Sequence, residues 1–192
     1  MTITVLDPIA ALLVVDLQNG ARLRPTAHPL DGVVANVVAL SSAFRAADLP
    51  VVLITNVGGA SGRTDASRSF RESGAAMPQP PEGWQELLPE LDRQPSDRVL
   101  ARSAWGAFVG TGLDDDLRAL GVTQVVLTGI ATSLGVESTA REARDRGYNV
   151  VFATDAMTDL NPVAHDHSVS TVFPYLGESG TTGDIEELFR TR

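Results

Sequence analysis

The sequence predicts an α/β fold, a three-layer α/β/α sandwich built around a mostly parallel, Rossmann-like central sheet. Five or six short apolar runs of strand length alternate with segments in which apolar residues recur at helical intervals. The chain has 192 residues, of which 43% are hydrophobic, so one sizeable core and a single domain over residues 1–192 are expected. Right-handed crossovers between parallel strands place helices on both faces of such a sheet.

The predicted strands are apolar runs bounded by residues that favour turns. Residues 9–15 are apolar throughout and end at Asp16, as expected of a central strand that is buried on both faces. The run 124–127 is rich in β-branched residues and lies between Gly121 and Gly129. The other strands are predicted at 50–55, 98–100 and 149–153.

The predicted helices have apolar residues at helical spacing or recognisable end signals. Residues 30–47 show the clearest apolar stripe and are expected to pack on the sheet. A helix that begins near Leu134 ends at Gly147, which suits a C-terminal cap. Further helices are predicted at 113–120, 162–173 and 183–190.

Three connections complete the chain. Residues 60–73 are polar and follow the second strand, a position typical of a lid or substrate loop, with a solvated loop as the alternative. Residues 77–95 contain five prolines and are expected to form a surface excursion with a short helix around 84–91. Residues 177–182 are predicted to be a loop before the last helix.

The composition excludes several classes of function. A net charge of −9 argues against nucleic-acid binding, which needs a concentrated basic surface. The absence of cysteine excludes disulfides, thiolate metal sites and thiol catalysis, and because all fifteen basic residues are arginine, lysine chemistry is excluded as well. The apolar runs are too short to span a membrane and the first residues lack the basic start of a signal peptide, so a cytoplasmic location is expected.

Polar residues follow several of the predicted strands at their carboxyl ends. Asp16, Asn56, Arg102 and the turn at 130–135 each occupy such a position, and in a parallel sheet these ends meet at one edge, so we expect a single cleft there. Two local alternatives stay open: Asp16 caps a turn, and Arg102 forms a plain surface ion pair.

Two motifs resemble those of the isochorismatase-like hydrolase superfamily. They are LLVVDLQNG at 12–20 and GIATSLGVESTAREARDRGYNVVFATDAM at 129–157, and the resemblance extends over residues 9–188. In that family a cysteine nucleophile usually opens the second motif's helix, and its position falls on Gly135. The resemblance further implies that Asp16 is a general acid or base, that Arg102 replaces the family's lysine, and that a cis peptide bond joins Ile130 to Ala131.

The resemblance favours one function and leaves a second open. The true isochorismatases of the superfamily also have glycine at the nucleophile position and hydrolyse a vinyl ether without a covalent intermediate. Asp16, Arg102 and Gly135 would then form the catalytic site for a small, acidic substrate. The predicted substrate-binding residues are Asn56, Arg63, Trp105, Ile130, Ala131 and Ser133. The alternative is a catalytically inactive relative that binds a small metabolite or supports a partner protein.

Some residues are assigned no chemistry. Asp155 is expected to organise a turn through hydrogen bonds to the backbone. His165 and His167 would face different sides of a helix, which makes a shared metal site improbable. No cofactor or metal is expected, since the segment after the second strand lacks the Asp-x-His pair of the zinc-binding amidases. A homo-oligomer, either dimer or tetramer, is expected, with apolar contacts from Trp105, Phe108, Phe173 and Tyr175.

Overall fold

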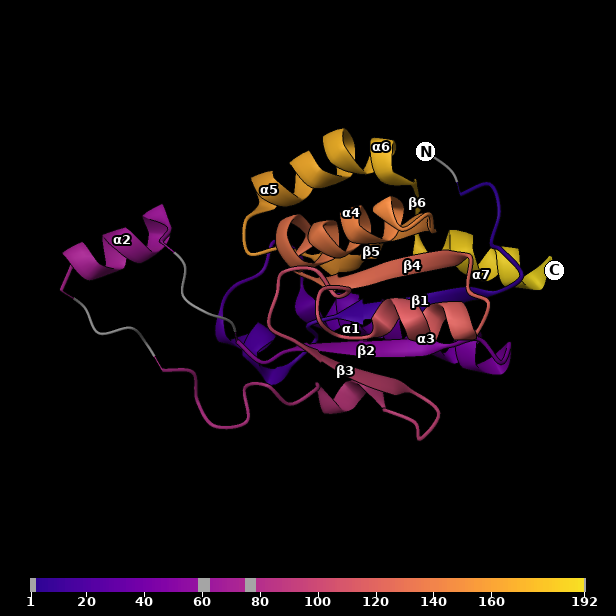
Figure 1. Ribbon diagram of the computed structural model, residues 1–192, viewed down its shortest axis with the longest axis horizontal. Helices are drawn as coiled ribbons and strands as arrows, with labels where there is room; N and C mark the ends of the chain where they lie inside the picture. The colour runs from indigo at the N-terminus through magenta and orange to yellow at the C-terminus, as the bar shows by residue number, and fades with distance from the viewer. Residues whose placement is uncertain (1–2, 59–62, 75–78, 192) are drawn as a thin grey trace.

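The computed structural model describes residues 3–58, 63–74 and 79–191 and has a six-stranded, fully parallel sheet at its centre (Figure 1). The strand order is β3-β2-β1-β4-β5-β6. The chain crosses over between β3 and β4, so that β1 and β4 lie side by side in the middle of the sheet. The strands are β1 (Ala10–Val15), β2 (Val51–Asn56), β3 (Arg98–Arg102), β4 (Gln124–Ile130), β5 (Asn149–Thr158) and β6 (Glu178–Gly180). The predicted α/β fold is therefore confirmed.

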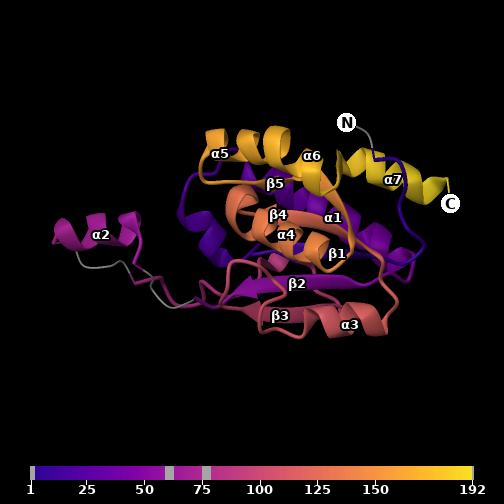
Figure 2. The same ribbon diagram turned by 45° about the horizontal axis from the view of Figure 1, so that its top comes forward.

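Helices cover both faces of the sheet and make the outer two layers (Figures 1 and 2). Helices α1 (Leu30–Ala46) and α7 (Thr182–Arg190) cover one face. The other face is covered by α3 (Leu113–Ala119), α4 (Glu137–Asp145) and the run formed by α5 (Pro162–His167), η4 (Ser168–Val172) and α6 (Phe173–Leu176). Shorter elements are the 3₁₀ turns η1 (Asn19–Leu23) and η2 (Pro89–Leu91), the π turn η3 (Thr132–Val136), and α2 (Asp65–Glu72).

Two hydrophobic cores separate these layers, because alternate strand residues point to opposite faces of a sheet. In β1, Leu13 and Val15 face the core under α3 and α4, while Leu12 and Val14 face the core under α1 and α7. Every residue of β1 and β4 is buried, as expected of central parallel strands. The buried aliphatic side chains each contribute roughly 1.5–3 kcal/mol on burial.

The structure corrects several predicted boundaries. Residues 154–157 form no turn, because β5 continues to Thr158 after a register shift against β4. Residues 177–182 include the edge strand β6, which is too short and too polar to be recognised as a strand. The part of the 60–73 loop that is described contains α2, which projects away from the sheet in both views (Figures 1 and 2). Residues 60–62 of that loop lie outside the described residues.

Asp155 accepts a hydrogen bond from the backbone, as expected, but it does so from within strand β5 and not from a turn. Its carboxylate accepts hydrogen bonds from the backbone N–H of Thr182 (2.7 Å) and from the Thr182 hydroxyl (2.9 Å). It therefore ties β5 to the first turn of α7, where a carboxylate also suits the helix dipole. Within the described residues, no helix is both long enough and apolar enough to cross a membrane.

Candidate active site

A cavity of about 700 Å³ opens at the carboxyl ends of the central strands. Its floor is formed by Asp16, Arg102 and Gly135, which follow β1, end β3 and lie in the π turn after β4, respectively. Apolar groups from the proline-rich segment 79–84 and from η1 form its walls. The cleft predicted from the strand ends therefore exists, and it joins groups that lie up to 119 residues apart in the chain.

Asp16 is held at the cavity floor by the end of β1. Its φ of 52° is in the left-handed region, which is uncommon for a residue other than glycine but tolerated by aspartate. Its backbone N–H donates to Ile54 O at 2.9 Å, which links the residue to β2. The carboxylate faces Arg102. The reading of Asp16 as a simple turn cap is therefore wrong.

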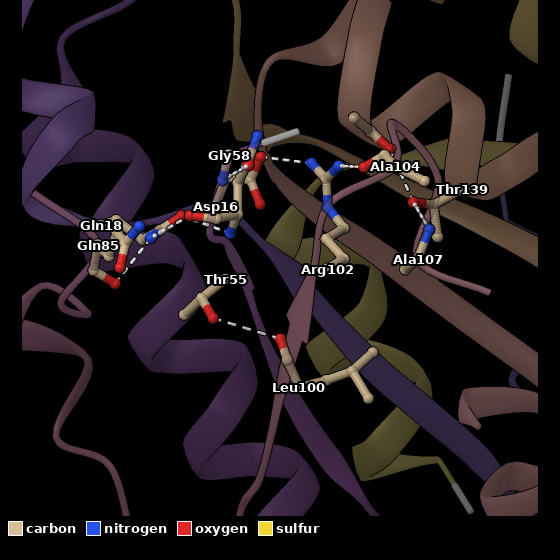
Figure 3. A network of polar contacts seen from close by, with 12 residues as sticks. Asp16, Gln18, Thr55, Gly58, Gln85, Leu100, Arg102, Ala104, Ala107 and Thr139 are labelled. Carbon is tan, nitrogen blue, oxygen red and sulfur yellow. Dashed lines mark hydrogen bonds and ion pairs between the residues drawn. The ribbon is translucent and has the colours of Figure 1, made fainter. Parts of the chain in front are cut away.

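Arg102 approaches Asp16 from the end of β3 and is buried, with a side-chain exposure of 2% (Figure 3). Its two terminal nitrogens donate to Asp16 Oδ2 and to the carbonyl oxygen of Ala104. Among the described residues, neither Arg102 Nε nor Asp16 Oδ1 has a hydrogen-bond partner, although both atoms are buried. Arg102 is thus not a surface ion pair, and each member of the pair retains an unused polar atom.

Burial and the neighbouring cation act on the Asp16 pKa in opposite directions. Burial is the larger effect and raises the pKa of Asp16 to about 6, although the Arg102 guanidinium lowers it through charge and hydrogen bonding. A carboxyl with a pKa near 6 is present in both protonation states close to neutral pH. Such a group can serve as an acid or as a base.

The turn that carries Gly135 is fixed by a buried polar network. The Ile130–Ala131 peptide bond is cis, as expected. Thr132 Oγ1 donates to Thr158 O at 3.0 Å and lies 2.9 Å from His165 Nδ1, which must therefore carry a proton and donate to the hydroxyl. Burial and nearby His28 lower the pKa of His165. A neutral imidazole thus supports the turn from behind.

Ser133 does not face the cavity. Its backbone N–H and its hydroxyl both donate to Asp159 Oδ2, each at 2.7 Å. Thr139 Oγ1 donates to Gly135 O at 2.7 Å and accepts from the Ala107 N–H at 3.2 Å. Ser133 therefore helps to position the turn. Thr139 separately links the segment after Arg102 to the start of α4.

Gln18 joins three segments that surround the cavity (Figure 3). Its side-chain amide donates to Asn56 O (3.1 Å) and Gln85 O (2.7 Å), and its carbonyl oxygen accepts from the Asn56 N–H (2.8 Å). Trp84 is held against the same loop, where its carbonyl accepts from Gly20 N at 2.9 Å. No role for Gln18 was predicted from the sequence. Its position two residues after Asp16 is the only feature of the sequence that places it near the site.

Most of the residues predicted for the site line this cavity, with two exceptions. Asn56, Trp105, Ile130 and Ala131 are present with the three floor residues. Arg63 and Ser133 are not among the described lining residues; Arg63 is exposed and precedes α2, which projects from the body of the protein. A loop that leaves the domain cannot be placed from its composition, so its arginine could not be positioned from sequence.

Other residues at the mouth of the cavity were missed by the sequence reasoning. Arg24 follows η1 and lines the cavity, and it forms no ion pair with any described residue. Trp84 forms part of the wall. Trp105 lies at the mouth with 66% exposure, whereas Phe108 is buried in the core against Tyr148. Arg24 lies in the loop between β1 and Pro25, where no periodic pattern of apolar residues shows which way a side chain points. Its place at the cavity could therefore not be predicted from the sequence.

Within the described residues, no group of three or more His, Asp or Glu side chains is placed to hold a metal ion. The floor residues offer a carboxyl with a pKa near 6, a fixed guanidinium and a glycine without a side chain between them.

Comparisons with known proteins agree with the α/β fold. The Isochorismatase domain family model matches residues 10–184. YwoC of Bacillus subtilis, an uncharacterized isochorismatase family protein, is 36% identical over 92% of both chains. The ureidoacrylate amidohydrolase RutB of Variovorax paradoxus is 32% identical, over 94% of this chain and 81% of its own. A structure of an isochorismatase family protein from Burkholderia thailandensis is 38% identical, with a TM-score of 0.86, and covers 98% of this chain and 100% of its own.

Proposed function

Because the chain belongs to the isochorismatase family of hydrolases, we propose that it hydrolyses the vinyl ether of a small acidic metabolite, of the isochorismate type, without a covalent intermediate. The observation that carries this proposal is the Asp16 carboxyl, which has a pKa of about 6, an Oδ1 without a hydrogen-bond partner among the described residues, and an Oδ2 that lies 3.6 Å from the place of a Cβ at Gly135. Vinyl-ether hydrolysis begins with protonation of carbon, which requires such an acid.

The proposed reaction starts from protonated Asp16. Because Oδ2 accepts from Arg102, the transferable proton resides on Oδ1, and in the proposed reaction the carboxyl rotates to present this buried atom to the substrate. This proton bonds to the terminal methylene carbon of the enol ether, and the double-bond electrons form the new C–H bond and leave an oxocarbenium ion. Water adds to the cationic carbon and returns a proton to Asp16. The resulting hemiketal collapses to pyruvate and the alcohol.

Arg102 and Arg24 have separate roles in this scheme. As the proton leaves Asp16, negative charge develops on a carboxylate that is already beside the guanidinium, so the ion pair is strongest where the transition state needs it. The uncommitted guanidinium of Arg24 at the mouth provides donors for carboxylates of the substrate. Preorganised acid catalysis of this kind supplies roughly 10²- to 10⁴-fold in rate.

A second activity is suggested by relatives such as RutB, which is an amidohydrolase. The absence of cysteine removes the thiolate that the family's amidases use. We therefore assign this chain the proton-transfer reaction, and amides become the contrasting substrates of the test.

The test is to incubate the purified protein with isochorismate and, separately, with a panel of simple primary amides. Pyruvate is measured by a coupled dehydrogenase assay and ammonia by a second coupled assay, each against a reaction without protein. We expect pyruvate and no ammonia. Release of ammonia, or a covalent adduct found by intact-protein mass spectrometry, would contradict the proposed mechanism. Absence of both products would favour the non-catalytic binding protein instead.

A further inference from the structure

We propose that Arg102 and Gly135 form one coupled pair, in which the guanidinium fills the space that a side chain at position 135 would need and so determines which class of reaction the cavity supports. The inference deepens the function proposed above and rests on it for the identity of the reaction. Its test, however, measures the coupling itself and needs no substrate.

Position 135 is closed to side chains by its neighbours. A Cβ atom added at Gly135 would lie 2.7 Å from Arg102 Nη2, 3.0 Å from Val15 Cγ1 and 3.6 Å from Asp16 Oδ2. The first distance is below any normal carbon–nitrogen contact, and the second is tighter than most. A side chain here therefore requires the guanidinium to shift, and backbone conformation plays no part, since Gly135 is not among the positive-φ glycines.

The guanidinium cannot easily move aside to make room. Arg102 is buried and donates to both Asp16 and Ala104 O, so displacing it would break a buried ion pair. The turn is also fastened, because Thr139 Oγ1 donates to Gly135 O and accepts from the Ala107 N–H. Val15, in the fully buried strand β1, bounds the same space as the guanidinium, so a side chain at position 135 is crowded by both neighbours.

The chemical consequence is that no nucleophilic side chain fits beside Asp16 while Arg102 is in place. Instead, a permanently charged guanidinium lies against the turn that begins the η3–α4 helix, and the N-terminal end of a helix is itself electropositive. The pair therefore favours an anionic group of the substrate at this point and proton transfer from Asp16, and it excludes covalent attack from position 135.

Lysine at position 102 should uncouple the two positions. A lysine side chain is one atom shorter, so it ends before the place of Arg102 Nη2, the nitrogen that both crowds Gly135 and donates to Asp16. Its ammonium group remains next to the Asp16 carboxylate. We therefore expect a side chain at position 135 to be tolerated much better when residue 102 is lysine.

A double-mutant cycle tests this coupling through the thermal unfolding midpoint. Gly135→Ala should lower Tm by about 5 °C in the native background, as overpacking of a closed site does. In the Arg102→Lys background, the additional decrease should be less than half as large. Gly32→Ala is the matched control, because a Cβ at Gly32 meets nothing within 4 Å, and its effect should be the same in both backgrounds.

A second measurement uses the absence of cysteine from the chain, which makes an introduced thiol unique. At pH 9.5, where an ordinary thiol is mostly ionised, alkylation by iodoacetamide reports access to the thiol. Gly135→Cys should react at least tenfold more slowly than Gly135→Cys combined with Arg102→Lys. Equal rates, equal decreases in Tm, or failure to fold in both backgrounds would overturn the coupling. Loss of the ether activity alone would overturn only the proposed function.

Discussion

Two buried ion pairs in this protein each join an arginine to an aspartate, but they differ in how many of their polar atoms are hydrogen-bonded. Asp97, whose side chain is 1% exposed, accepts from Arg45 Nε (3.0 Å), Arg45 Nη2 (2.6 Å) and the Gln94 N–H (2.8 Å). Asp16 accepts from Arg102 through one oxygen only, and its other oxygen and Arg102 Nε have no partner among the described residues.

The difference separates a structural pair from a functional one. A buried charge pair is tolerated when its remaining lone pairs and protons are hydrogen-bonded, and the pair at Asp97 meets that condition. The pair at Asp16 does not meet it, and it lies on the floor of the cavity. Incomplete hydrogen bonding together with a place at the cavity distinguishes this pair from the structural one.

Exchanging each aspartate for asparagine should give the largest contrast between the two pairs. Asp16→Asn removes the proposed acid, so the rate of pyruvate release should fall by roughly 10²- to 10⁴-fold. Asp97→Asn should leave that rate within about threefold but lower the free energy of unfolding by about 3 kcal/mol, because Arg45 loses its buried counter-charge. Rates and urea unfolding curves of both variants provide the measurement.

The two variants also serve as controls for each other. If Asp97→Asn reduced the rate as strongly as Asp16→Asn did, loss of activity would reflect general destabilisation and the distinction between the pairs would fail. If Asp16→Asn kept the native rate, Asp16 would not be the acid.

The pH dependence of kcat/KM should reveal which protonation state of Asp16 is active. Burial raises the pKa of Asp16 to about 6, and a general acid works only while protonated. The value of kcat/KM should therefore be flat well below pH 6 and approach a tenfold fall per pH unit above it, about 50-fold in all between pH 6 and pH 8. Initial rates at low substrate concentration, corrected for spontaneous decay of the substrate, give the profile. A profile that rises through pH 6 would assign Asp16 the role of base.

The central part of the fold was predictable from the sequence because its signals are local. Residues 9–15 and 124–127 are apolar runs with clear boundaries, and they became β1 and β4. The edge strand β6 and the continuation of β5 beyond residue 153 were missed, since polar residues there pair with neighbours that only the folded sheet supplies.

The position of the site was predictable from the sequence, but its detailed geometry was not. Asp16 and Arg102 could be placed at one edge of the sheet because each follows a parallel strand. Their grouping with Gly135 was predicted from the family resemblance, but the close approach of Arg102 to the Gly135 position was not, since it depends on the path of one long side chain across β2. The pKa of Asp16 was equally out of reach, because it is a balance between burial and charge that only the packed structure determines.

The smallest effect on the kinetics is expected from a second comparison, between two arginines near the surface. Arg22 in η1 is committed, with contacts to Asp31 (3.0 Å) and Glu90 (2.6 Å), whereas Arg24 lines the cavity and forms no ion pair with a described residue. Arg24→Gln should raise KM for the acidic substrate about fivefold and change kcat less than twofold, because an exposed ion pair contributes at most about 1 kcal/mol. Steady-state kinetics of Arg24→Gln and Arg22→Gln provide the measurement.

Arg22→Gln is the matched control, since it removes the same charge from the same loop and should leave both KM and kcat unchanged. Added salt should reduce the effect of Arg24→Gln, because screening weakens a contact at the open mouth of the cavity far more than one at its buried floor. Equal increases in KM for the two variants would show that substrate responds only to the net charge of the loop, and Arg24 would then have no specific contact with it.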